Sequence, residues 1–121
     1  MVKKETKLDI KINECLNEFY KLMNQMAEEL GLKMSNFNVA HGMHNDNNYS
    51  TAYDIGKLCC HAMTKDIFKE VVKVQQRETP SLLIAGHIYK WENTNALLKE
   101  GYTGLKTGIT PTAGPCLAAT T

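Results

Sequence analysis

The sequence predicts an α+β fold in which N-terminal helices pack with antiparallel strands. Two observations support this class. In the first part of the chain, apolar residues recur every three or four positions, which is the period of a helix with one buried face. Farther along, the period falls to two and turn residues become frequent, as in antiparallel hairpins. We therefore expect one partial domain, residues 1–121, with a helical part at 11–72 and a strand-rich part at 73–121.

The first helix is predicted from an apolar face that ends at Gly31, because glycine readily adopts the left-handed conformation that stops a helix. Lysine and glutamate fill the opposite face. The simplest interpretation of the apolar face is core packing. Its members are Ile12, Cys15, Leu16, Phe19, Leu22, Met23, Met26 and Leu30.

The next segment, residues 34–49, is rich in asparagine and is expected to form an ordered loop, because asparagine side chains bond to nearby backbone. Ser50 or Thr51 then caps a second helix, and Asp54 stands three residues after Thr51, as in a capping box. A short third helix is expected to begin at Asp66.

Four strands in two hairpins are expected after the helices. They cover residues 72–77, 84–91, 102–110 and 116–119. Pro80 ends the first strand, since proline cannot donate to a strand ladder, and Leu97 and Leu98 suggest one helical turn between the hairpins. The turn of the second hairpin lies at 111–114. No later element covers the apolar last strand, which indicates a piece of a larger sheet.

Composition excludes several classes of partner. Of the 121 residues, 43% are hydrophobic and 22% charged, and the formal net charge of +1 gives no reason to expect a nucleic acid. No apolar run approaches the roughly 20 residues that span a bilayer, and no signal peptide is recognised, so the localisation stays unknown.

Metal and cofactor sites are not expected. His41 and His44 lie three apart in a loop with Asp46 nearby, but they lack a convincing third ligand of the usual kind, so a structural role is favoured over a metal site. The four cysteines do not form a CxxC pair, and we expect them to be buried or partly buried free thiols.

Several segments follow one another in an informative order. They are Leu30-Gly31-Leu32, His41-Gly42-Met43, Tyr49-Ser50-Thr51-Ala52-Tyr53-Asp54, Trp91-Glu92-Asn93-Thr94-Asn95-Ala96-Leu97-Leu98, and Gly104-Leu105-Lys106-Thr107-Gly108-Ile109-Thr110-Pro111-Thr112-Ala113-Gly114. Together they resemble the motifs of the D-alanyl-D-alanine carboxypeptidase family, the peptidase S11 type within the superfamily of penicillin-binding proteins and serine β-lactamases. The resemblance covers about residues 14–121. It implies the C-terminal half of a catalytic domain with a β-lactamase/transpeptidase-like fold.

The resemblance also implies an activity and a ligand. In the complete protein, a serine hydrolase would remove the terminal D-alanine of peptidoglycan peptides through an acyl-enzyme, without a cofactor, and would bind D-Ala-D-Ala-terminated peptides or β-lactams. Lys106 would be the catalytic residue of this half, with its charge near the substrate carboxylate. Thr107 would hydrogen-bond that carboxylate, Gly108 would leave room for the substrate, and the Ile109 N–H would stabilise the oxyanion.

The nucleophile of such an enzyme is absent from this sequence. The family needs Ser-x-x-Lys and Ser-x-Asn motifs, and none of Ser35, Ser50 and Ser81 begins either one. In the family both motifs precede the helix that begins here near Ile12. We therefore expect the chain alone to be inactive.

Three interpretations remain open. The chain is part of a longer serine carboxypeptidase, or an inactive remnant that serves as a binding or structural subunit, or one half of a site whose serine half is a separate chain. In the last case, the missing N-terminal half is itself a partner. Members of the family usually act outside the cytoplasm.

Overall fold

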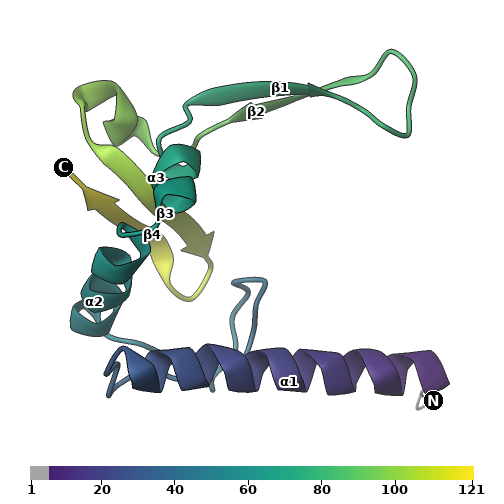
Figure 1. Ribbon diagram of the computed structural model, residues 1–121, viewed down its shortest axis with the longest axis vertical. Helices are drawn as coiled ribbons and strands as arrows, with labels where there is room; N and C mark the ends of the chain where they lie inside the picture. Colours follow the sequence, from purple (N-terminus) through teal and green to yellow (C-terminus); the bar gives the residue numbers. More distant parts are fainter. Residues whose placement is uncertain (1–5) are drawn as a thin grey trace. The chain divides into compact units, whose positions relative to one another are not determined.

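The computed structural model describes residues 6–121, so that residues 1–5 of the predicted domain lie outside the described part (Figure 1). Helices and antiparallel strands follow one another as the α+β class requires. The elements are α1 (Lys7–Glu29), α2 (Ala52–Ala62), α3 (Asp66–Val72), β1 (Gln76–Pro80), β2 (Ile88–Glu92), the 3-10 helix η1 (Ala96–Glu100), β3 (Thr103–Thr110) and β4 (Gly114–Thr120). They fall into two compact units, one ending at Leu58 and one running from Cys59 to Thr121. None of the described helices is long and apolar enough to cross a membrane.

Helix α1 begins at a capping box. The Asp9 N–H donates to the Thr6 hydroxyl over 3.2 Å, and the Thr6 N–H donates to the Asp9 carboxylate over 2.8 Å. These bonds, the side-chain bond from Thr6 above all, lower the pKa of Asp9 below its ordinary value. At the other end Gly31 has a φ of 66°, which confirms the predicted stop of the first helix.

The apolar face of α1 is exposed. We call it the α1 stripe: Leu8, Ile12, Leu16, Phe19, Leu22 and Met26. The exposed fraction of these side chains runs from 39% at Leu16 to 67% at Leu8, and the only residue of α1 classed as buried is Ala27. The amphipathic pattern thus predicts the helix correctly, but the expected core packing of this face is not found within the described residues.

The loop after α1 is ordered by side-chain bonds, as its asparagine content predicts. Asn24 of α1 donates to the Phe37 carbonyl over 2.7 Å and accepts from the Phe37 N–H over 2.8 Å. The two ends of the loop meet where Asn36 and Tyr49 form an isolated antiparallel bridge. One asparagine amide thus replaces a strand partner for this stretch of backbone.

Asp54 ties this loop to the start of α2. Its N–H donates to the Thr51 hydroxyl over 3.1 Å, so Thr51 caps the helix as expected. The carboxylate does not complete a capping box, however. It accepts from the Met34 N–H and from the Ser35 hydroxyl, each at 2.8 Å, and Asp54 is only 3% exposed. The second half of the expected capping box is therefore not found among the described residues, and the two loop donors share the Oδ2 atom of this carboxylate.

Replacing Asp54 with asparagine is expected to lower the free energy of unfolding by about 1.5–3 kcal/mol, the range for a hydrogen bond to a charged group. Urea unfolding followed by circular dichroism measures the change. Asp46→Asn is the matched control, because the Asp46 side chain is 94% exposed. Equal unfolding midpoints for the two variants would contradict the role of Asp54.

The first hairpin pairs β1 with β2 in antiparallel register, from Gln76 opposite Glu92 to Pro80 opposite Ile88. The strand expected at 72–77 is therefore wrong in its first half, because Val72 completes α3 instead. Val71 and Val72 fit the apolar pattern of a helix as well as that of a strand, and in the structure both belong to α3. The partner strand also begins later than expected, at Ile88.

The second hairpin pairs β3 with β4 and agrees with the strands predicted around the turn at 111–114. Pro115 lies near the start of β4, opposite Ile109, where a missing N–H is tolerated. Helix α3 and the 3-10 helix both contact β3, and Val72 and Leu98 are the buried apolar residues of this unit. This packing fixes the strand that carries the candidate site.

Candidate functional site

Strand β3 presents the Lys-Thr-Gly triplet in its central part. Thr107 pairs with Leu117 of β4, and Gly108 pairs with Cys116. The register shifts between Gly104 and Lys106, which marks a β-bulge just before the triplet. Bulges re-aim the side chains that follow them, and here the residues concerned are those of the candidate site.

Thr107 is half-buried, and its hydroxyl has a partner. The Oγ1 atoms of Thr107 and Thr94 lie 2.6 Å apart, within the range of an O–H···O hydrogen bond. Thr94 belongs to the motif at residues 91–98, but the resemblance to the family implies no role for it. In the sequence, only the position of Thr94 within this motif indicates that it lies near the site.

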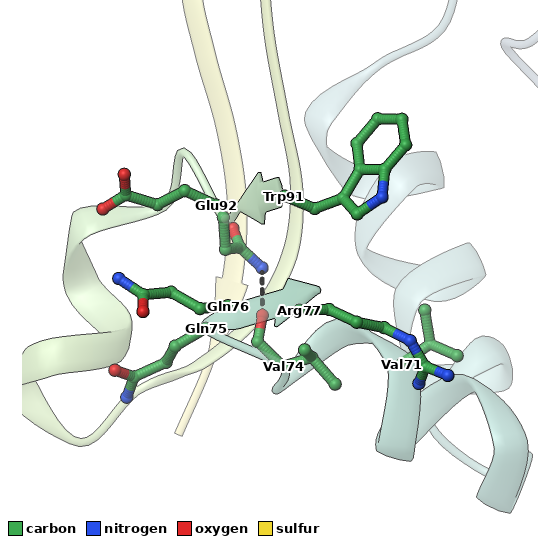
Figure 2. A pocket seen from close by; sticks show the side chains of 8 residues that line it. Val71, Val74, Gln75, Gln76, Arg77, Trp91 and Glu92 are labelled. Atoms are coloured by element: carbon green, nitrogen blue, oxygen red, sulfur yellow. Dashed lines mark hydrogen bonds between the residues drawn. The ribbon is translucent and has the colours of Figure 1, made fainter. Parts of the chain in front are cut away.

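The segment that carries Thr94 is held from both sides. The Asn93 side chain donates to the Val74 carbonyl over 3.1 Å, the bond drawn as a dashed line in Figure 2. Its own Oδ1 accepts from the Asn95 N–H over 3.0 Å. Asn95 in turn caps the 3-10 helix, accepting from the Leu97 N–H over 3.1 Å. The two asparagines that flank Thr94 thus fix its backbone.

Gly104 allows this segment to reach β3. A Cβ atom at this position would lie 2.9 Å from Asn95 Nδ2 and 3.0 Å from the Val72 carbonyl oxygen. Asn95 is 5% exposed, and within the described residues its Nδ2 has no hydrogen-bond partner. A side chain at Gly104 would therefore push the Asn95 loop away from the strand.

A hollow of about 550 Å³ opens beside the triplet. It is lined by Thr94, Asn95, Ala96, Leu97, Thr107, Gly108, Ile109, Pro115, Cys116 and Leu117. The three residues predicted to bind substrate, Thr107, Gly108 and Ile109, thus come together on one surface. Nothing lies within 4 Å of a Cβ placed on Gly108, so a ligand can approach the backbone there. The apolar lining fits a small side chain, and the hydroxyls fit a polar group.

Lys106 does not line this hollow. Its side chain is exposed, and its ammonium donates to the carbonyl of the adjacent Thr107. Among the described residues no acidic side chain pairs with this ammonium. It can therefore turn toward an anion at little cost.

A second hollow, of about 310 Å³, lies at the base of the first hairpin. Figure 2 shows Arg77 and Trp91 beside it, with Val71 on α3 and Val74 on the segment between α3 and β1. It contains none of the predicted site residues. It is connected to the candidate site through Asn93, which lines this hollow and holds the segment that carries Thr94.

Two of the histidines have partners within the loop that follows α1. His41 accepts from the Met43 N–H over 3.0 Å, and His44 lies 3.1 Å from Asp46. Within the described residues there is no group of three or more histidine, cysteine or acidic side chains placed to hold a metal ion.

The thiols are more exposed than expected. Cys15, Cys60 and Cys116 are exposed, so the expectation of buried or partly buried thiols is wrong for them. Cys59 is partly buried as expected. Burial, and secondarily the neighbouring Cys60, raises the pKa of its thiol.

Comparison with known proteins identifies the family. The sequence profile of the D-alanyl-D-alanine carboxypeptidases, peptidase S11, matches residues 10–121. The chain belongs to this family. It is 36% identical over 107 residues to a D-alanyl-D-alanine carboxypeptidase of Streptomyces sp. strain K15, covering 84% of this chain and 37% of that protein. It is also 36% identical over 107 residues to the D-alanyl-D-alanine carboxypeptidase DacF of Bacillus subtilis, covering 84% of this chain and 26% of that protein.

The solved structures agree. The crystal structure of the Streptomyces K15 DD-transpeptidase superposes with a TM-score of 0.78 at 32% identity, over 98% of this chain and 46% of that chain. A single-site mutant of the same protein gives a TM-score of 0.81 at 33% identity, with the same coverage. The predicted fold and family are thus confirmed. The chain spans less than half of the length of these relatives.

Proposed function

We propose that this chain supplies the carboxylate-binding edge of a serine-type D-Ala-D-Ala carboxypeptidase. The observation that carries the proposal is the hollow in which Thr107, Gly108 and Ile109 meet beside an unobstructed strand backbone. Membership of the peptidase S11 family supports the reaction class. In the complete protein the product would be free D-alanine from the end of a peptidoglycan peptide.

The roles follow from the chemistry of acyl transfer. A serine hydroxyl from the rest of the domain attacks the carbonyl of the penultimate D-alanine, and the resulting oxyanion is stabilised by N–H donors such as that of Ile109. The C–N bond breaks, the leaving amine takes a proton, and water then hydrolyses the ester. Lys106 and Thr107 bind the terminal carboxylate, and Gly108 lets the substrate backbone lie against β3. The same groups would hold the carboxylate of a β-lactam.

A second candidate is a catalytically inactive remnant that acts as a binding or structural subunit. The specific observation in its favour is that none of the serines in these 121 residues begins a Ser-x-x-Lys or Ser-x-Asn motif. The two candidates differ in whether a complete acyl-transfer site forms.

A chimera distinguishes them. Residues 10–121 replace the matching segment of the Streptomyces K15 DD-transpeptidase, which retains the remainder of its own chain. The chimera is expected to be labelled covalently by a fluorescent penicillin and to release D-alanine, whereas the 121-residue chain alone is expected to show neither reaction. Gel fluorescence and an amino-acid assay provide the measurements.

Folding of the chimera is verified by a cooperative thermal transition in circular dichroism. A folded chimera without labelling would contradict the proposal and favour the inactive remnant. Labelling of the chain alone would contradict the absence of a nucleophile.

A further inference from the structure

In the contact between Thr94 and Thr107, the proposed ligand determines which hydroxyl donates the hydrogen bond. A hydroxyl has one proton to donate and can accept as well, so in a contact of 2.6 Å only one of the two threonines is the donor. A carboxylate accepts hydrogen bonds and donates none. If Thr107 donates to a bound carboxylate, its proton is used there, and Thr94 must be the donor in the contact between them.

The backbone of Thr94 is fixed independently of this contact. Asn93 is bonded to the Val74 carbonyl, and its N–H donates to the Gln75 carbonyl over 2.8 Å. On the other side, Asn95 is buried beneath Gly104. Thr94 therefore starts from a rigid position. The Thr107 hydroxyl is not required to hold the Thr94 backbone, so the contact between the two side chains can orient the Thr107 hydroxyl.

We propose that Thr94 is a positioning residue, which donates to Thr107 and thereby aims the Thr107 hydroxyl at the terminal carboxylate of the substrate. This inference rests on the proposed function and deepens it. Both threonines line the same hollow, so the chain of donors runs from Thr94 through Thr107 to the ligand. Hydrogen bonds in such a chain polarise one another, so the bond to the carboxylate is stronger than Thr107 alone would provide.

A purely structural role makes a different prediction. In that case the contact only joins the segment at residues 93–95 to β3, and its loss affects stability and every ligand equally. A positioning role affects ligands with a carboxylate and depends on the hydroxyl proton of residue 94. The two roles are therefore separated by substrate chemistry and by the conservative variant.

The experiment uses the complete protein, with Thr94→Val to remove the hydroxyl at nearly constant volume and Thr94→Ser to retain it. For a D-Ala-D-Ala peptide, Thr94→Val is expected to lower kcat/KM by about 3- to 10-fold, the value of one hydrogen bond. Most of the loss is expected in KM. Thr94→Ser is expected to stay within about twofold of the wild type.

The methyl ester of a penicillin lacks the carboxylate and serves as the second ligand. Its acylation of the protein is measured by mass spectrometry over long incubation, and Thr94→Val is expected to leave that rate unchanged.

Each other outcome overturns the inference. Equal losses with the free penicillin and its methyl ester, together with a lower unfolding temperature, would show a structural contact only. Unchanged kinetics in Thr94→Val would show that Thr107 needs no positioning, as would equal effects of valine and serine. If the wild-type protein is not acylated by the free penicillin at all, the proposed function fails, and that result is distinct from any effect of Thr94.

Discussion

If the proposed function holds, replacing Lys106 with methionine in the complete protein is expected to lower kcat/KM for D-alanine release by about 10- to 100-fold, because the charge-assisted bond to the terminal carboxylate, worth about 1.5–3 kcal/mol, is lost. The side chain is exposed and bonds only to the adjacent Thr107 carbonyl among the described contacts, so the fold does not depend on it. Methionine keeps the length of the side chain and removes the charge. Steady-state assays of D-alanine release provide the measurement.

Lys99→Met is the matched control, because Lys99 is an exposed lysine of the 3-10 helix in the same compact unit. Its rate is expected to stay within about twofold of the wild type, as are the unfolding midpoints of both variants. A Lys106→Met protein with normal turnover would remove Lys106 from the site. An equal loss in Lys99→Met would point to a general effect of charge instead.

Gly104→Ala is expected to destabilise the protein by about 1–3 kcal/mol, the cost of adding a methyl group to a packed site. The new Cβ would lie 2.9 Å from Asn95 Nδ2 and 3.0 Å from the Val72 carbonyl, and the latter is backbone that cannot turn aside. Replacement of glycine also stiffens the unfolded chain, which offsets about 0.4–1 kcal/mol without reversing the sign. Urea unfolding measures the difference.

Gly108→Ala provides the control on the same strand. Nothing lies within 4 Å of the added methyl group, so the free energy of unfolding is expected to stay constant or rise slightly. Because Gly108 faces the substrate in the proposed function, the same change is expected to raise KM. Equal destabilisation by the two alanines would contradict the close approach of Asn95 to Gly104.

The sequence was sufficient for most of the fold because the period of apolar residues is a local property. Helix α1 and the hairpin of β3 and β4 follow from it directly. The boundary between α3 and β1 does not, since the valines around Val72 fit either structure until tertiary packing selects one. The use of the Asp54 carboxylate was also unpredictable, because its donors lie 20 and 19 residues away.

The candidate site could be anticipated only in part from the sequence. The triplet at Lys106 is recognisable as a motif, whereas its neighbours across space are not. Thr94 lies 13 residues from Thr107, and only the packing of the intervening segment beneath Gly104 brings the two hydroxyls together. Neither the spacing of these residues nor the composition of the chain predicts that the two hydroxyls meet.

Any polypeptide surface that covered the α1 stripe would couple folding of the helix to association. Its side chains, from Leu8 to Met26, are 39–67% exposed, and each fully buried apolar side chain is worth about 1.5–3 kcal/mol. A polypeptide surface that covers the stripe binds the folded helix in preference to the unfolded chain, so by mass action it raises the apparent stability of the helix in proportion to the logarithm of its concentration. The melting temperature measured for this chain would then depend on the concentration of the covering surface as well as on the chain's own contacts.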